Sequence, residues 1–226
     1  MVGLIIGVVL IGAAYYYYQS SSMSDPKAVK DRCKNRSAEQ IKAIRYFSVE
    51  GCFKKIMSDD EYDAMVASMA SQNFKQKAMD KIGLDESQLS EIAPVCFEGF
   101  QFLKQAPSKY GKDNNARSAC YQVSWLFFSA TQVYLYQYTF YTDRDDRKET
   151  TDEYFYKDIT SFSTSSDTEE TTFWDNDKKE YILKNVDSHR FLMSVMGEKF
   201  YCALKQTDEN ERAIQGMKAK LREKKG

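Results

Sequence analysis

The pattern of apolar and polar positions divides the chain into four parts. Residues 1–18 carry no charge, and residues 19–36 are mostly polar. Between 37 and 93 apolar residues recur at helical spacing, whereas from 94 to 226 apolar and polar positions alternate in short runs before a final helical segment. We therefore expect an α+β protein with an apolar N-terminal helix, a polar tether with a first helical turn, a helical region, and a β domain that ends in a helix.

The first segment, MVGLIIGVVLIGAAYYYY, has the properties of a membrane span. As a helix it would be about 27 Å long, close to the roughly 30 Å thickness of a hydrocarbon core. Its terminal tyrosines suit the membrane–water interface. Because basic residues follow the segment and none precede it, the positive-inside rule predicts a single-pass anchor in a cell inner membrane or plasma membrane, with the body in the cytoplasm. These basic residues are Lys27, Lys30, Arg32, Lys34 and Arg36.

Two features of the same segment leave other interpretations open. Gly12–Ala14 resembles a cleavage site, so a removed export signal is the alternative, although no Lys or Arg stands ahead of the apolar run. Gly3 and Gly7 have the spacing that lets two spans pack closely. Self-association of the chain is therefore a further expectation.

Capping patterns mark the helices expected between residues 37 and 93. The predicted starts are Ser37 with Gln40, Ser58, and Asp85 with Gln88. Gly83 is expected to end the longest of these helices, and Pro94 to end the last. The region is therefore expected to form a small helical unit ahead of the strands.

From residue 95 to residue 204, seven runs rich in aromatic and β-branched residues predict seven strands. The acidic stretch STSSDTEETTFWDND (163–177) is unlike a core strand, and we expect a polar loop or an edge there. A final helix is expected to begin near Thr207 or Asp208. Its apolar stripe consists of Ile214, Met217 and Leu221.

Three stretches of the β region resemble the bacterial pleckstrin-homology-like domains: EYFYKDITSFS (153–163), GEKFYCAL (197–204) and ERAIQGMKAKL (211–221). The resemblance covers about residues 95–225. It implies a seven-stranded antiparallel barrel or sandwich whose open end is covered by the C-terminal helix. It also implies a polar kink in YKDITSF before Ile159, which turns inward.

Composition narrows the classes of function. The chain has 42% hydrophobic and 29% charged residues and a formal net charge of −1, so it has no overall basic field for nucleic acid. Its five cysteines are scattered without a CxxC pair, and the one histidine, His189, has no partner at metal-ligand spacing. We therefore expect no zinc site and no cofactor, and the dispersed cysteines fit a reducing compartment.

The sequence carries no established catalytic motif: GxSxG, GxGxxG, P-loop, HExxH and kinase patterns are all missing. His189 beside Asp187 has the residue types of an acid–base pair, but we expect it in an ordinary turn between strands. We therefore expect no enzymatic activity, and rank an enzyme of unrecognised type third among the candidate functions.

Two groups of residues are candidate contacts. In pleckstrin-homology domains that bind phosphoinositides, the loop between the first two strands is basic, and the matching loop here holds Lys104, Lys109, Lys112 and Arg117 against Asp113. These cations are predicted to contact an anionic lipid or a partner, with a solvated hairpin loop as the alternative.

The second candidate contact is aromatic. Phe173 and Trp174 stand in a polar stretch, where they predict either a small buried cluster or an exposed contact surface. Together these features predict a non-catalytic, membrane-anchored adaptor or assembly module with a protein partner. The alternative is an exported or envelope-side structural protein.

Overall fold

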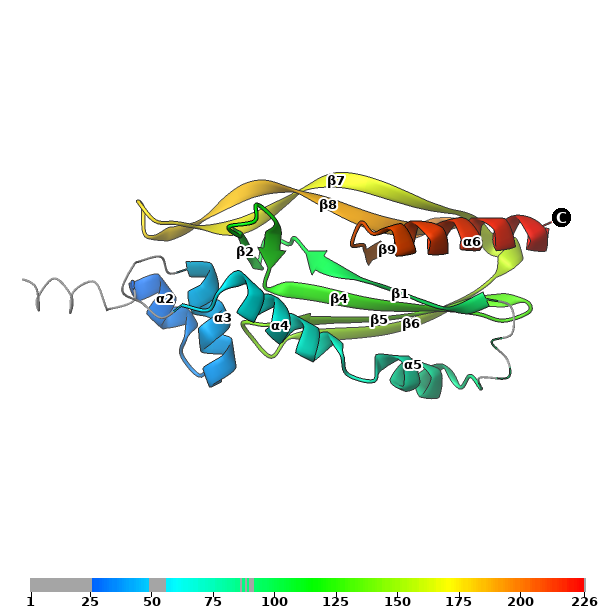
Figure 1. Cartoon of the computed structure of the whole chain (residues 1–226), viewed down its shortest axis with the longest axis horizontal. Helices are drawn as coiled ribbons and strands as arrows, with labels where there is room; N and C mark the ends of the chain where they lie inside the picture. Colours follow the sequence, from blue (N-terminus) through cyan, green and yellow to red (C-terminus); the bar gives the residue numbers. More distant parts are fainter. Residues whose placement is uncertain (1–25, 49–55, 86, 88, 90–91, 226) are drawn as a thin grey trace, which may run out of the picture.

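The computed structural model describes residues 26–48, 56–85, 87, 89 and 92–225, and their arrangement is shown in Figure 1. These residues form three layers: a layer of helices, a four-stranded sheet, and a five-stranded sheet that has the C-terminal helix beside it.

The four-stranded sheet, sheet A, is antiparallel throughout, in the order β1-β4-β5-β6. Its strands are β1 (Ile92–Gln101), β4 (Cys120–Phe128), β5 (Gln132–Tyr141) and β6 (Arg147–Phe155). The five-stranded sheet, sheet B, has the order β3-β2-β7-β8-β9, and its β2–β7 pair is parallel. Its strands are β2 (Pro107–Tyr110), β3 (Ala116–Ser118), β7 (Ile159–Asp175), β8 (Glu180–Val195) and β9 (Glu198–Ala203).

In the described ranges, four helices precede the strands: α2 (Lys27–Arg32), α3 (Ala38–Ser48), α4 (Asp59–Ala70) and α5 (Phe74–Ile82). The predicted capping box forms at Ser37 with Gln40, and the predicted cap Ser58 forms a box with Glu61, which was not among the predicted capping residues. Gly83 ends α5 in the left-handed conformation, which glycine adopts at low cost. The box predicted at Asp85 with Gln88 falls partly outside the described residues.

Two hydrophobic cores lie on opposite faces of sheet A. Helices α4 and α5 cover one face, where their side chains pack on those of β4 and β5, such as Phe127 and Tyr136. Helix α3 packs on α4 and lies against β2 and β7. The other face packs against sheet B and α6 (Asp208–Lys225) through Phe97, Leu126 and Phe191. The predicted stripe of α6 is confirmed, because Ile214, Met217 and Leu221 are the buried residues of that helix.

Strands β7 and β8 form a long twisted ribbon that buries opposite faces at its two ends (Figure 1). Near α6 it buries Phe162 and Phe191, whereas near the β7–β8 turn it buries Phe173 and Val186. Side chains of a strand alternate between its two faces. Phe162 and Phe173 on β7, like Val186 and Phe191 on β8, are an odd number of positions apart, so the two residues of each pair lie on opposite faces of the ribbon. The right-handed twist of a two-stranded ribbon accounts for this exchange of faces.

The prediction of one seven-stranded antiparallel barrel or sandwich is wrong, because the strands form two separate open sheets of four and five strands. The acidic stretch 163–177, expected as a loop or an edge, lies largely in β7 and pairs along its length with β8. Its threonines favour extended backbone, and a ribbon that is solvated in its middle does not need apolar residues there. His189, expected in a turn, lies within β8.

The membrane-spanning helix that completed the fold prediction also needs correction. In the part of the chain that the structure describes, no helix is both long enough and apolar enough to cross a membrane. Residues 1–18, to which the prediction assigned that helix, lie outside the described residues. The local prediction for YKDITSF is confirmed: a short 3-10 turn at Tyr156–Asp158 precedes the fully buried Ile159.

Candidate functional site

A groove of about 660 Å³ runs between the edge strand β1 and the N-terminal half of α6, and we call it the β1–α6 groove. Its apolar lining comes from both elements and from the neighbouring strand β4. The main apolar residues are Pro94, Val95, Trp125, Ala213 and Met217. A groove with such a lining offers apolar side chains a place away from water.

The backbone of Cys96 faces this groove. The Glu98 carbonyl accepts a hydrogen bond from the Lys205 N–H at 3.2 Å, so the backbone groups of Glu98 point away from β4. Cys96 stands two residues earlier in an unbroken register with β4, and its N–H and C=O therefore point to the same side. Within the described ranges, no backbone partner is found for these two groups of Cys96. Sheet A thus has an unpaired edge position at Cys96 beside the groove, between Pro94, which has no N–H, and Glu98, whose carbonyl is occupied by Lys205.

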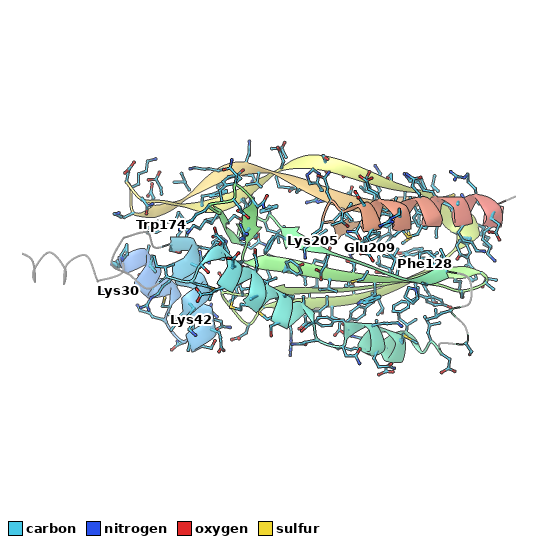
Figure 2. The ribbon with its side chains drawn as sticks, viewed as in Figure 1. Lys30, Lys42, Phe128, Trp174, Lys205 and Glu209 are labelled. Atoms are coloured by element: carbon cyan, nitrogen blue, oxygen red, sulfur yellow. The ribbon has the colours of Figure 1, made fainter. Side chains whose placement is uncertain are left out.

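Charged residues form the rim of the groove. Figure 2 shows Lys205 and Glu209 at the start of α6. Lys205 Nζ lies 2.6 Å from a carboxylate oxygen of Glu98, and this ion pair is largely exposed. Arg212 is exposed and donates through Nε to the Asp208 carbonyl at 3.2 Å. The rim therefore carries both signs of charge around an apolar floor.

Gly216 keeps the α6 wall of the groove low. A Cβ added at this position would meet no atom within 4 Å, so the space beside it is open. Glycine in a helix interior costs about 1 kcal/mol relative to alanine. The position therefore accepts a larger side chain without a clash, and such a side chain would fill part of the groove.

A second cavity, of about 590 Å³, lies on the other flank of α6 against the β7–β8 ribbon. Here His189 Nδ1 lies 2.8 Å from Ser166 Oγ and 3.2 Å from Gln206 Nε2. Asp187, on the same face of β8, accepts instead from Thr168 at 3.2 Å. Because both contacts of the imidazole use one ring nitrogen, the arrangement differs from a nucleophile–base–acid relay, in which the two nitrogens have different partners.

The side chains of three of the four predicted cations are engaged within the protein, and two of these, Lys109 and Arg117, stand opposite each other in the β2–β3 pair. Lys104 pairs with Glu170 on β7 at 2.6 Å. Lys109 Nζ donates to the Tyr46 carbonyl at 3.3 Å and lies over the Tyr46 ring. Lys112 is exposed, and its backbone N–H donates to Asp59 at 2.8 Å.

Arg117, the fourth predicted cation, is nearly buried, with 6% of its side chain exposed. Its guanidinium donates to both carboxylate oxygens of Asp63 at 2.8 and 2.7 Å, and to both of Asp113 at 2.9 Å. The hydrogen bonds that Arg117 donates to Asp63 and Asp113 raise the pKa of Arg117, and the contact with Asp113 lowers the pKa of that carboxyl group. The guanidinium is thus occupied in joining α4 to the β2–β3 loop.

The predicted aromatic pair belongs to two small clusters. Phe173 is buried with Phe102 and Val186, and its ring stacks on Tyr110 at 5.5 Å. Trp174 is half-buried and meets Tyr181 edge to face at 5.0 Å. The cluster interpretation therefore describes Phe173 fully, and it also describes the half-buried Trp174, which packs against Val29 and Ile44.

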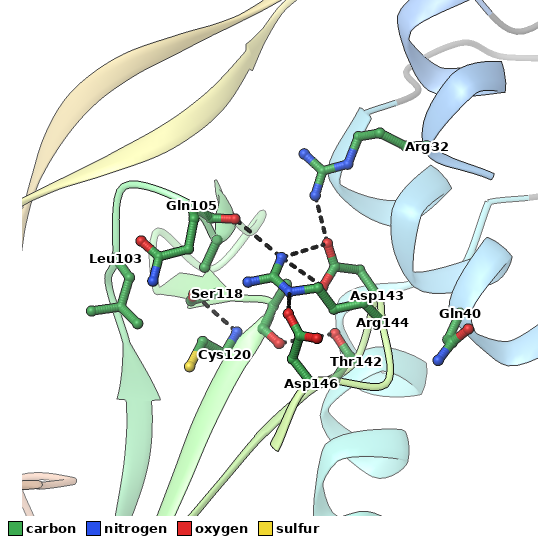
Figure 3. Close-up of polar contacts among 12 residues, drawn as sticks. Arg32, Gln40, Leu103, Gln105, Ser118, Cys120, Thr142, Asp143, Arg144 and Asp146 are labelled. Carbon is green, nitrogen blue, oxygen red and sulfur yellow. Dashed lines mark hydrogen bonds and ion pairs between the residues drawn. The ribbon is translucent and has the colours of Figure 1, made fainter. Parts of the chain in front are cut away.

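A further polar network surrounds Asp143, just after β5 (Figure 3). Its carboxylate, 2% exposed, accepts from Arg32 of α2 at 2.5 Å and lies 3.5 Å from Arg144. Arg144 also donates to the Gln105 carbonyl at 3.1 Å and to Asp146 at 2.7 Å. A buried carboxylate needs such partners, and here they connect α2 and the loop after β1 to sheet A.

Three of the described thiols are held in their protonated form by burial. Burial raises the pKa of Cys96, Cys120 and Cys202 to about 12, which keeps these thiols protonated near neutral pH. In the described ranges, no group of three or more histidine, cysteine, aspartate or glutamate side chains is placed to hold a metal ion.

In comparisons with known proteins, no family model, no curated protein and no solved structure matches this chain. The pleckstrin-homology-like resemblance stays a prediction. The β1–α6 groove was missed in the sequence because it forms between elements more than a hundred residues apart. The one local signal was Gly216, an exposed glycine inside an otherwise regular helix.

Proposed function

We propose that this protein is a non-catalytic adaptor that takes up an extended, apolar segment of a partner protein in the β1–α6 groove. The observation that carries the proposal is the open backbone edge at Cys96 beside an apolar groove. Exposed sheet edges bind peptides as an added strand, with backbone hydrogen bonds for affinity and pockets for side-chain selection.

The geometry of the groove indicates the kind of segment it would accept. An added strand would place alternate side chains toward Val95 and Met217 on one side and toward Trp125 on the other. Apolar residues at alternate positions satisfy both sides, and the mixed charges of the rim suit polar residues at the ends of the segment.

The first experiment selects peptides from a phage-displayed library of random decapeptides on the full-length protein. We expect the selected sequences to share alternating apolar positions. The selected peptides should bind the Gly216→Phe variant at least tenfold more weakly than the natural chain, because the phenylalanine ring fills the groove. Gly216→Ala is the matched control, because it also replaces the helix glycine by a better helix former while leaving most of the groove open.

A second variant tests the backbone contact. Cys96→Pro removes the outward N–H but leaves the hydrogen bonds between β1 and β4 in place, and proline is tolerated at such edge positions. We expect weaker binding of the selected peptides and a circular dichroism spectrum like that of the natural chain. If no peptide is enriched, or if Gly216→Phe binds the enriched peptides as well as the natural chain does, the proposed function is wrong.

A further inference from the structure

Strand β6, the edge of sheet A opposite to β1, presents its own open row of backbone groups. The hydrogen bonds from Ser129 N to Gln132 O and from Thr142 N to Ala119 O show that even-numbered residues of β5 bond to β4. The odd-numbered residues of β5 therefore bond to β6, where their partners have even numbers. It follows that the odd-numbered residues of β6 point their N–H and C=O groups away from the sheet.

Charges of opposite sign stand at the two ends of β6. The strand begins with Arg147 and Lys148, and carries Asp152 and Glu153 near its end. Arg147, Lys148 and Glu153 are exposed, and Asp152 is half-buried. None of the four takes part in an ion pair within the described part of the chain. No ion pair among the described residues therefore has to break for these charges to meet a second molecule.

A second copy of β6, laid antiparallel against the first, meets these charges with their opposites. When the pairing is centred on Thr150, Arg147 stands opposite Glu153 of the partner subunit, and Lys148 stands opposite the partner's Asp152. In this register odd-numbered residues face odd-numbered residues, as the outward backbone groups require. By symmetry each ion pair forms twice.

The neighbouring registers are less favourable. A shift of the pairing by two residues in either direction brings Glu149 opposite Glu149 or opposite Glu153 of the partner subunit. Like charges directly opposite each other destabilise a strand pair. One register therefore combines attraction between opposite charges with hydrogen bonding.

We propose that two copies of this chain associate through β6, so that their four-stranded sheets join into one continuous antiparallel sheet. Charges on an edge strand usually deter pairing with other strands. On β6 their order makes the strand complementary to its own antiparallel copy. The contact is isologous, as in most closed dimers.

Charge exchange tests this contact on the full-length protein. The variant R147E/K148E has an entirely acidic set of these four positions, and the variant D152K/E153K has an entirely basic set. We expect the natural chain to sediment as a dimer at low salt. Each variant alone should show about half that mass. An equal mixture of the two variants should again show the mass of the dimer. The lysines of the β7–β8 turn supply the control, K178E/K179E, which should leave the mass unchanged.

The same measurement contains the results that would overturn the inference. The inference is overturned if the natural chain sediments as a monomer at all accessible concentrations. It is also overturned if a charge variant remains dimeric on its own. Circular dichroism of each variant identifies one that fails to fold, and recovery in the mixture requires both to be folded. Since β1 and β6 are opposite edges of sheet A, peptide binding and dimer formation can fail independently.

Discussion

The guanidinium of Arg117 lies between carboxylates that come from different layers of the molecule, Asp63 on α4 and Asp113 in the β2–β3 loop. The adjoining glycine, Gly111, is constrained by this contact, because a Cβ there would come within 2.3 Å of Arg117 Nη1. A cation that the sequence places in a polar loop thus has a structural role between helices and sheet.

We expect Arg117→Ala to lower the free energy of unfolding by about 2 kcal/mol, since it removes charge-assisted hydrogen bonds to two carboxylates that are themselves nearly half exposed. Arg117→Lys should recover only part of the loss, because lysine cannot make the paired bidentate contacts. Urea unfolding followed by circular dichroism measures both. A loss below about 0.5 kcal/mol, the range of ordinary surface substitutions, would contradict this role.

Glu149 on β6 provides a test by pH. Burial acts to raise its pKa, but hydrogen bonds from Tyr136, Lys81 and Lys77 outweigh that effect and lower the pKa to about 2. A carboxylate with a lowered folded-state pKa contributes stability above its unfolded-state pKa, and this contribution is lost as the pH falls toward the folded value.

The stabilisation by Glu149 should therefore be complete above about pH 5 and decline between pH 5 and about pH 2. Unfolding midpoints of the natural chain and of Glu149→Gln, measured from pH 7 to pH 3, should converge as the pH falls. A gap between the two proteins that stays constant over this range would show that the carboxylate charge is not the source of the stabilisation.

Among the elements, α6 combines a structural and a functional surface. Its buried stripe closes the core between the two sheets, while Ala213 and Gly216 line the β1–α6 groove. We expect Ile214→Ala to lower the free energy of unfolding by about 2–4 kcal/mol, because the site is 3% exposed and a cavity would remain.

The neighbouring exposed position supplies the comparison for that substitution. Gln215→Ala should change the stability by less than about 0.5 kcal/mol. Equal losses for the two variants, measured by thermal unfolding, would mean that α6 is not docked through this stripe.

The sequence predicted those elements that depend on neighbours along the chain. The caps at Ser37 and Ser58, the stop at Gly83 and the stripe of α6 all rest on contacts within a few residues. The division of the strands into two sheets could not be predicted in this way. It depends on pairings such as Pro107 with Thr172, which alternation within one strand does not specify.

The same limit applies to the sites. Lys104 and Arg117 lie in one segment whose composition is typical of an anion-binding loop. In the structure, however, they form ion pairs with carboxylates of β7 and α4. Those carboxylates lie more than fifty residues away in either direction, so local charge counting could not assign them to these cations.

In the molecule as a whole, β4 connects both cores, because Phe127 packs with the helices and Phe128 packs with sheet B and α6. The helical region and the strands therefore share one sheet. We expect a fragment of residues 92–226 to bind the dye ANS and to lose cooperative unfolding, since it exposes the apolar face of sheet A that α4 and α5 cover. A fragment that melts cooperatively near the temperature of the full chain would instead establish the β region as an independent domain.

The exchange of faces along the β7–β8 ribbon limits how its length can vary among natural variants. One residue added to each strand in the middle would keep the pairing but turn Phe173 and Val186 away from the body, while Phe162 and Phe191 stayed in place. Two residues added to each strand would restore the orientation of all four side chains. Insertions and deletions accepted there during evolution are therefore expected to occur as matched pairs of residues on both strands.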